Sequence, residues 1–192
     1  VTYNIATKVS SEEIHLLGLS KYIQEELGRF METENFFIAL KKEDDTVAFV
    51  YNADQKSEEE ISFSRKMSNG LTEHILLTGE KVLLNDQEHI DFELKNNVKV
   101  LGEMSKSWIG APIYIKKDVI GVIACQSYEK VNQYDSTHLD LLSYVGSQIG
   151  MFINRVTNER IKNEFTETLE RTVKERTHKL EIAKNESKYQ LD

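Results

Sequence analysis

The sequence predicts an α+β fold, an antiparallel sheet covered by helices and extended by a long C-terminal helix. Two hairpin patterns, at 36–51 and 108–128, place short apolar runs on either side of a polar turn, and helical apolar patterns flank them. A sheet with two apolar faces needs helices to cover it. The chain has 192 residues, 40% of them hydrophobic, which suits one domain with an appendage.

The first predicted element is a helix that begins near Ser10. Ser10 and Glu13 have the spacing of a capping box, in which each side chain accepts a backbone N–H at the helix start. Apolar residues then recur at three- and four-residue steps as far as Phe30, which indicates a helix with one buried face. The runs 36–40 and 47–51 form the first hairpin.

The middle of the chain predicts smaller elements. The polar stretch 55–64 is expected to be a loop, and 70–77 a helix that ends at Gly79, because glycine readily adopts the left-handed conformation that follows many helices. After this helix we expect a strand at 81–84, a short helix at 86–94 and a polar loop at 95–107.

The second hairpin, 108–115 and 119–128, leads into a helix that Asp135 caps. No Gly or Pro lies between 151 and 192, so nothing in the sequence ends this helix. Its last part carries a narrow apolar stripe with a stutter in the heptad, which predicts a coiled coil and a homodimer. The predicted dimer and connector contacts are Ile149, Phe152, Phe165, Leu169, Val173, Leu180 and Ala183.

Composition excludes several classes of protein. The net charge of −8 argues against a nucleic-acid partner, because proteins that bind nucleic acids present a basic surface to the phosphates. No apolar run approaches the roughly 20 residues of a membrane span, so no membrane insertion is expected. A single cysteine, Cys125, rules out an intrachain disulfide and favours a reducing, cytoplasmic compartment. The histidines are scattered, which predicts surface positions and no metal site.

Three stretches resemble a known family. GLTEHILLTGEKVLLND, at 70–86, resembles the helix, glycine turn and third strand of a GAF domain, and 109–149 resembles its last hairpin and final helix. LERTVKERTHKLEIAKN, at 169–185, is similar to the coiled-coil connectors that precede output modules in bacterial sensor histidine kinases and cyclic-dinucleotide enzymes. The resemblance implies a GAF-like six-stranded antiparallel sheet with the first and last helices on one face and a ligand pocket on the other. It divides the chain into an N-terminal linker (1–9), a GAF sensory domain (10–154) and a coiled-coil signalling connector (155–192).

Strand alternation then predicts which side chains face that pocket. On the second hairpin, Ile109, Ala111, Ile113, Val122 and Ala124 are assigned to the helix-covered face. The predicted pocket residues are Phe37, Ala39, Phe49, Tyr51, Trp108, Gly110, Pro112, Ile123, Cys125 and Ser127, with Trp108 either a pocket wall or part of the core. A register error of one residue would invert any strand of this set.

The resemblance implies a cytoplasmic small-molecule sensory domain of a bacterial signal-transduction protein, of two-component or related type. As a homodimer it would pass ligand state to a downstream output domain. The alternative is a ligand-free dimerisation and spacer module whose pocket is filled by aromatic side chains.

Neither a cofactor nor an enzymatic activity is predicted for these residues. GAF relatives that reduce methionine sulfoxide need several cysteines, and this chain has only Cys125. Gln126 and Ser127 stand where bilin-binding relatives place histidines, and the motif of the cyclic-nucleotide-binding branch is missing. No catalytic triad, glycine-rich phosphate loop or helical metal motif is present.

Overall fold

The computed structural model describes residues 11–56, 62–99 and 103–189, and the chain divides into two compact units, 1–152 and 153–192. The predicted linker 1–9 and the capping residue Ser10 lie outside the described residues. In chain order the elements are α1 (Ser11–Leu27), β1 (Asn35–Lys41), β2 (Thr46–Ala53), β3 (Phe63–Lys66), α2 (Leu71–Thr78), β4 (Val82–Asn85), α3 (Asp86–Asn96), β5 (Ser107–Ile115), β6 (Asp118–Ser127) and α4 (Ser136–Tyr189).

The strands form one six-stranded sheet in the order β3-β2-β1-β6-β5-β4, with every neighbouring pair antiparallel. This confirms the predicted fold class. The sequence pattern did not mark β3, a short edge strand that pairs with β2. The predicted helix at 70–77 is confirmed as α2 and ends at Gly79, whose φ is 73° and whose N–H donates to the Ile75 carbonyl at 2.8 Å.

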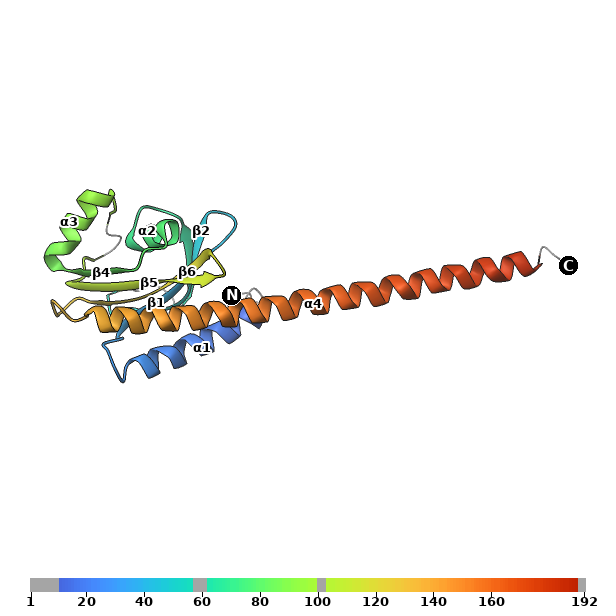
Figure 1. Ribbon diagram of the computed structural model, residues 1–192, viewed down its shortest axis with the longest axis horizontal. Helices are drawn as coiled ribbons and strands as arrows, with labels where there is room; N and C mark the ends of the chain where they lie inside the picture. The colour runs from blue at the N-terminus through green and yellow to red at the C-terminus, as the bar shows by residue number, and fades with distance from the viewer. Residues whose placement is uncertain (1–10, 57–61, 100–102, 190–192) are drawn as a thin grey trace, which may run out of the picture. The chain divides into compact units, whose positions relative to one another are not determined.

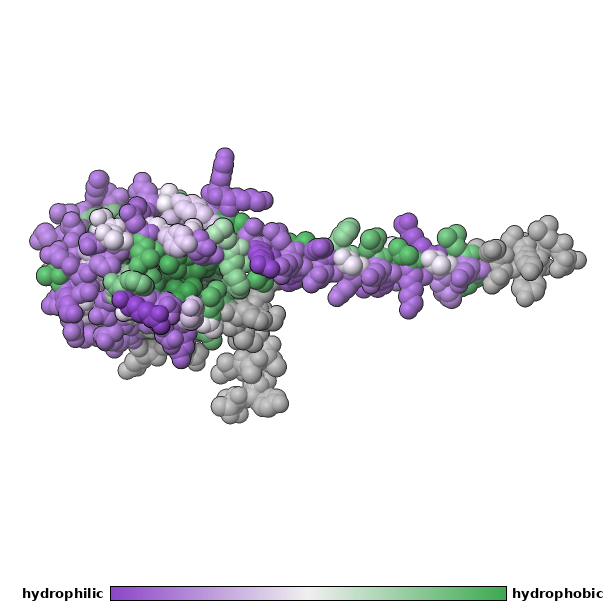
Figure 2. Space-filling model, turned by 60° about the horizontal axis from the view of Figure 1, so that its bottom comes forward, coloured by the Kyte–Doolittle hydropathy of each residue, from purple (hydrophilic) through white to green (hydrophobic). Residues whose placement is uncertain are grey.

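Helices cover both faces of the sheet. In the domain unit, α2 and α3 lie on one face, and α1 and the first part of α4 lie on the other (Figure 1). We call these the α2 face and the α4 face. On the side that carries α1 and α4, apolar side chains gather at the surface (Figure 2).

A β-bulge interrupts the first hairpin. Ala39 of β1 pairs with Phe49 of β2. The preceding residue, Ile38, pairs with Tyr51, so Val50 is an extra residue in β2. Cross-strand partners share a face of the sheet, and the extra residue therefore places Phe49 and Tyr51 on opposite faces, although they are two positions apart.

The second hairpin contains a bulge of the same kind. Tyr114 of β5 pairs with Val119 of β6, whereas Ile113 pairs with Gly121, so Ile120 is the extra residue. Beyond this bulge, every side chain of β6 faces the side opposite to the one that a regular hairpin would give it.

Two glycines of α4 lie against the backbone of the sheet. A Cβ at Gly150 would lie 2.0 Å from the carbonyl oxygen of Tyr114, and one at Gly146 would lie 3.0 Å from that of Pro112. Larger residues do not fit at this approach. Leu142 and Ile149 of the same helix are buried in the domain, so Ile149 packs in the core of its own chain and is not available for the dimer contact that we predicted for it.

In the unit 153–192 the structure describes the rest of α4, as far as Tyr189. From Ile161 to Leu180 its apolar side chains are exposed and form an interrupted row along the helix (Figure 2). They include Ile161, Phe165, Leu169, Val173 and Leu180. The side chain of Ala183 lies outside the described ones. Among the helices of the described residues, none has the length and apolar character needed to cross a membrane.

Candidate functional site: a cavity on the α2 face

A cavity of about 430 Å³ lies on the α2 face of the sheet. Its walls come from β1, β2, β3, β5, β6, α2 and α3 and from the segment before β5. The volume is within the range of sites for small organic molecules.

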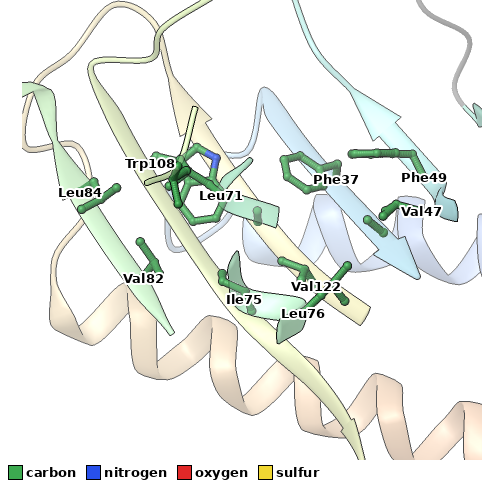
Figure 3. Close-up of a cluster of buried hydrophobic side chains, with 13 residues drawn as sticks. Phe37, Val47, Phe49, Leu71, Ile75, Leu76, Val82, Leu84, Trp108 and Val122 are labelled. Carbon is green, nitrogen blue, oxygen red and sulfur yellow. The ribbon is translucent and has the colours of Figure 1, made fainter. Parts of the chain in front are cut away.

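Aromatic side chains form the apolar part of the cavity wall. Phe37 and Phe49 have ring centroids 5.3 Å apart, and Phe49 stacks on Phe63 at 4.5 Å with the rings nearly parallel. Trp108 and Leu71 add to this wall. These side chains belong to a buried cluster that joins the sheet to α2, with Phe37, Phe49 and Trp108 on the sheet and Leu71 on the helix (Figure 3).

A buried ion pair forms a second part of the wall. Glu73 in the first turn of α2 is 0% exposed and accepts a hydrogen bond from the Arg65 guanidinium of β3. Its carboxylate also accepts the N–H and the hydroxyl of Ser68 and the N–H of Gly70, each at 3.2 Å. Burial raises the pKa of Glu73, but the bonds and charge of Arg65 and the backbone N–H groups outweigh it, so the net pKa lies below its usual range.

Arg65 is also held by its aromatic neighbour. Its guanidinium carbon lies 5.2 Å from the centre of the Phe49 ring, a cation–π arrangement. One guanidinium nitrogen donates to Ser68 Oγ at 3.0 Å as well as to Glu73. The positive charge of Arg65 is therefore compensated within the protein.

A hydrogen-bonded carboxylate forms a third part of the wall. Asp54, just after β2, accepts the amide N–H of Gln126 at 2.8 Å, the hydroxyl of Tyr128 at 2.8 Å and the backbone N–H of Lys56 at 2.8 Å. Burial, followed by the hydrogen bond and charge of Asp54, raises the pKa of Tyr128. The phenol therefore stays protonated at neutral pH and acts as the hydrogen-bond donor to Asp54.

Two further groups line the cavity. Lys56 Nζ lies 3.7 Å from Glu103 Oε1, a contact between exposed side chains. His89 of α3 is 1% exposed and faces the cavity, so the expectation that the histidines lie at the surface is wrong for this residue. Among the described residues, no group of His, Cys, Asp and Glu has the arrangement of a metal site.

The structure brings some of the predicted pocket residues together. Phe37, Phe49 and Trp108 line the cavity. Ala39, Gly110 and Pro112 lie on the same face of the sheet but outside the described lining. Gly110 gives room to the Trp108 ring, because a Cβ at Gly110 would lie 2.3 Å from a ring carbon.

Four predicted pocket residues lie on the other face. Tyr51 donates to Gln24 Oε1 of α1 at 2.5 Å, because the bulge at Val50 turns it away from the cavity. Ile123, Cys125 and Ser127 pair with Ala111, Ile109 and Ser107, and the bulge at Ile120 turns all three to the α4 face. The inward residues of β6 are Val122, Ala124 and Gln126.

The same inversion explains the position of Cys125. The residue is 0% exposed on the α4 face, and burial, together with the charge of Glu32, raises the pKa of its thiol. A buried, protonated thiol is a poor nucleophile.

The sequence reasoning missed the charged part of the site. Arg65, Glu73 and Asp54 were not proposed, and Gln126 was considered only as a replacement for a histidine. Glu73 resembles an ordinary acidic residue in the first turn of a helix, and its pairing with Arg65 depends on the unpredicted strand β3. An acidic residue among the apolar positions of α2 was the one available signal.

The fold and the cavity define a class of α+β domain, in which a single antiparallel sheet has a small-molecule-sized cavity on one face and α1 and the first part of α4 on the other. The family comparison gives the particular family. Residues 16–154 match the model of the GAF domain, so the chain belongs to the GAF family. Domains of this family are typically regulatory and non-catalytic.

Solved structures share the fold at low sequence identity. A methyl-accepting chemotaxis protein, residues 122 to 287, has a TM-score of 0.60 at 17% identity, with 75% of this chain and 89% of that chain covered. The GAF domain of a two-component sensor histidine kinase from Bacillus halodurans has a TM-score of 0.55 at 15% identity, covering 79% and 98%. A type II free methionine-R-sulfoxide reductase from Thermoplasma acidophilum has a TM-score of 0.57 at 14% identity, covering 74% and 94%. No similar sequence was found among curated proteins.

Proposed function

We propose that this GAF domain is a cytoplasmic sensory module of a bacterial signalling protein. It binds a small molecule in the cavity on the α2 face and passes the ligand state through α4, as a homodimer, to an output domain. The observation that carries the proposal is that the two hairpin strands β5 and β6 contribute Trp108 and Gln126 to the cavity and hold α4 on their other face.

Only the sheet separates the cavity from the first part of α4. Trp108 and Gln126 are directly paired across β5 and β6, and both line the cavity. On the reverse side, the same strands pack against α4 through Ile113 and Ile123, both 0% exposed, which lie next to Gly146. A packed interface of this kind has few alternative arrangements, so a ligand that shifts β5 and β6 biases the position of α4.

The last part of α4 supports the homodimer. Leu169, Val173 and Leu180 are 51%, 56% and 70% exposed. An isolated helix with exposed apolar residues at these spacings gains stability when a second copy covers them. The steps of four residues from Ile161 to Val173 fit a coiled coil with a stutter.

An enzymatic role is not part of this proposal. A free methionine-R-sulfoxide reductase has a similar fold. The resemblance to the GAF family implies that such an enzyme needs several cysteines, whereas the single Cys125 of this chain is buried on the face away from the cavity. The residues facing the cavity are paired charges and aromatic rings, which are suited to binding.

A thermal-shift screen with matched variants tests the sensory role. A ligand that binds only the folded state at 100 times its Kd stabilises it by about 2.7 kcal/mol, which for a chain of this size raises Tm by roughly 5 to 10 °C. Asn52→Trp fills the cavity, because Asn52 lines it, whereas Lys41→Trp adds the same side chain at an exposed position of β1. We expect the screen to find a metabolite that raises the Tm of the wild type and of Lys41→Trp and does not change the Tm of Asn52→Trp.

One observation favours the ligand-free spacer as the second candidate. Phe49 already packs against Phe37, stacks on Phe63 and lies under the Arg65 guanidinium, so these side chains fill part of the cavity wall without a ligand. A spacer would show no ligand-dependent shift across a broad metabolite set, while remaining a dimer through α4.

A further inference from the structure

Among the described residues, the cavity contains one carboxylate that forms no ion pair, that of Asp54. Five charged residues line it among those the structure describes: Asp54, Lys56, Arg65, Glu73 and Glu103. Arg65 pairs with Glu73, and Lys56 Nζ lies 3.7 Å from Glu103 Oε1. Asp54 accepts only from neutral donors, the Gln126 amide, the Tyr128 hydroxyl and a backbone N–H. The lining therefore has an excess of one negative charge, and it is located at Asp54.

Hydrogen bonds fix the position of the Asp54 carboxylate, and this carboxylate can accept a further hydrogen bond from a ligand. Three donors occupy its oxygens, and an ionised carboxylate offers about four acceptor sites. Tyr128 donates its proton to Asp54, and its oxygen accepts an N–H of the Gln126 amide at 2.8 Å, which leaves one further lone pair on that oxygen beside the carboxylate. A ligand N–H placed here meets two acceptors whose positions are already fixed.

Aromatic side chains lie next to this carboxylate. Gln126, which binds Asp54, is paired with Trp108 across the β5–β6 ladder, and directly paired residues are neighbours on one face. Phe37 is paired with Asn52, two residues before Asp54. A positive group held by Asp54 is therefore within reach of aromatic rings, which attract cations and cover apolar groups.

The cation Arg65 does not make the cavity a good site for an anionic ligand. Arg65 is neutralised by the buried Glu73 and covered on one face by Phe49. An anionic ligand would have to compete with Glu73 for Arg65 and would share the cavity with Asp54 and Glu103, both of the same charge.

We propose that the cavity binds a small protonated amine, with the ammonium group on Asp54 and Tyr128 and an apolar body against Phe37, Phe49 and Trp108. This inference rests on the proposed sensory function and adds the chemical class of the ligand. The primary and secondary amines bind better than quaternary ones, because a charge-assisted hydrogen bond to Asp54 requires an N–H.

Three probes that share a phenylethyl group and differ in charge test the inference: phenethylamine, 2-phenylethanol and 3-phenylpropionate. Each is titrated by calorimetry into the wild type, Asp54→Asn, and Glu43→Gln, which alters an exposed carboxylate in the β1–β2 turn. We expect phenethylamine to bind with a Kd of about 1 mM, as befits a ligand of its size. Binding to Asp54→Asn should be at least about tenfold weaker, since a hydrogen bond to a charged group is lost, and unchanged in Glu43→Gln.

The outcomes separate this inference from the proposed function. Preference for 3-phenylpropionate, or equal loss of the amine in Asp54→Asn and Glu43→Gln, would overturn the amine site and leave a ligand-binding cavity in place. Failure of all three probes to bind would overturn the amine site as well, and the metabolite screen judges the sensory role separately. Asp54→Asn keeps the size of the side chain and its bonds from Gln126 and Tyr128, and its melting temperature without ligand checks that it folds. Tyr128→Phe provides a second variant and should weaken the amine but not the alcohol.

Discussion

The first and last parts of α4 present apolar residues in opposite environments. In the domain, Leu142 and Ile149 are 0% and 1% exposed, because the sheet covers them. In the unit 153–192, Leu169 and Val173 are more than half exposed. One continuous helix therefore contains a part stabilised by its own domain and a part that has the pattern of an interface. We therefore expect substitutions in the covered part of α4 to change the stability of the domain, and substitutions in the exposed part to change the oligomeric state.

The largest expected effect is on the dimer. In Val173→Asp/Leu180→Asp, charges replace two residues of the apolar row, and burying unpaired charges in a coiled-coil seam costs several kcal/mol. We expect a monomer at micromolar concentration, measured by sedimentation equilibrium, with the melting temperature of the domain nearly unchanged. The control Lys174→Asp/His178→Asp places aspartates on the other side of the helix and should remain a dimer. A double variant that stays dimeric would show that the seam lies elsewhere.

The next effect tests the part of α4 that the sheet covers. Gly150→Ala places a methyl group 2.0 Å from the Tyr114 carbonyl oxygen, so α4 must move away from the sheet. We expect the free energy of unfolding to fall by about 3 kcal/mol, as measured by urea denaturation. Gly18→Ala in α1 meets nothing within 4 Å and should be neutral or stabilising by up to about 1 kcal/mol. Equal effects of the two substitutions would contradict the close packing at Gly150.

A third prediction concerns the buried ion pair. Arg65→Met leaves Glu73 buried without its cation, and breaking such a pair typically costs about 3 kcal/mol, less here because the Ser68 and Gly70 donors remain. We expect a loss of about 2 kcal/mol in urea denaturation. The matched change Arg155→Met removes an exposed pair with Glu159 and should cost less than about 0.5 kcal/mol. Similar losses in the two variants would mean that the Arg65 pair contributes no more than a surface pair.

The smallest effect is the pH dependence of the same pair. Glu73 has a pKa below its usual value of 4.5, so its ionised form stabilises the fold above that pH, and the contribution is lost as pH falls through the folded-state pKa. Wild-type stability should therefore decline below about pH 4.5 more steeply than that of Glu73→Gln, which no longer titrates. Parallel curves from pH 6 to 3 in urea denaturation would show that Glu73 is not preferentially stabilised in its charged form.

The fold was largely predictable because its signals are local. Apolar periodicity marked α1, α4 and the two hairpins, and Gly79 marked the end of α2. The edge strand β3 was missed because its sequence, FSRK, has one apolar residue and contributes only one side of a ladder.

The orientation of the pocket residues was less predictable, because each hairpin has an extra residue within an apolar run. Val50 and Ile120 are β-branched apolar residues. Gly121, which follows Ile120, was the available signal of the second bulge, whereas no glycine stands beside Val50 in the first hairpin. Phe37 and Phe49 precede or adjoin the first bulge and were placed correctly. Tyr51 and Cys125 lie beyond a bulge and were inverted.

The charged part of the candidate site could not be found from the sequence for a different reason. Asp54 and Gln126 are 72 positions apart in the sequence. They come within hydrogen-bonding distance because β2 and β6 both pair with β1, one on each side of it. The spacing of residues along the chain does not predict such a long-range hydrogen bond. The order and register of the strands must be known before this pair of residues can be proposed.

Native mass spectrometry of the purified chain tests the ligand-binding dimer most directly, because one spectrum reports both subunit count and bound mass. We expect a dimer that carries an additional small-molecule mass, which is lost when the protein is denatured. A monomer with the mass of the bare chain would contradict both the dimer formed through α4 and the ligand held on the α2 face.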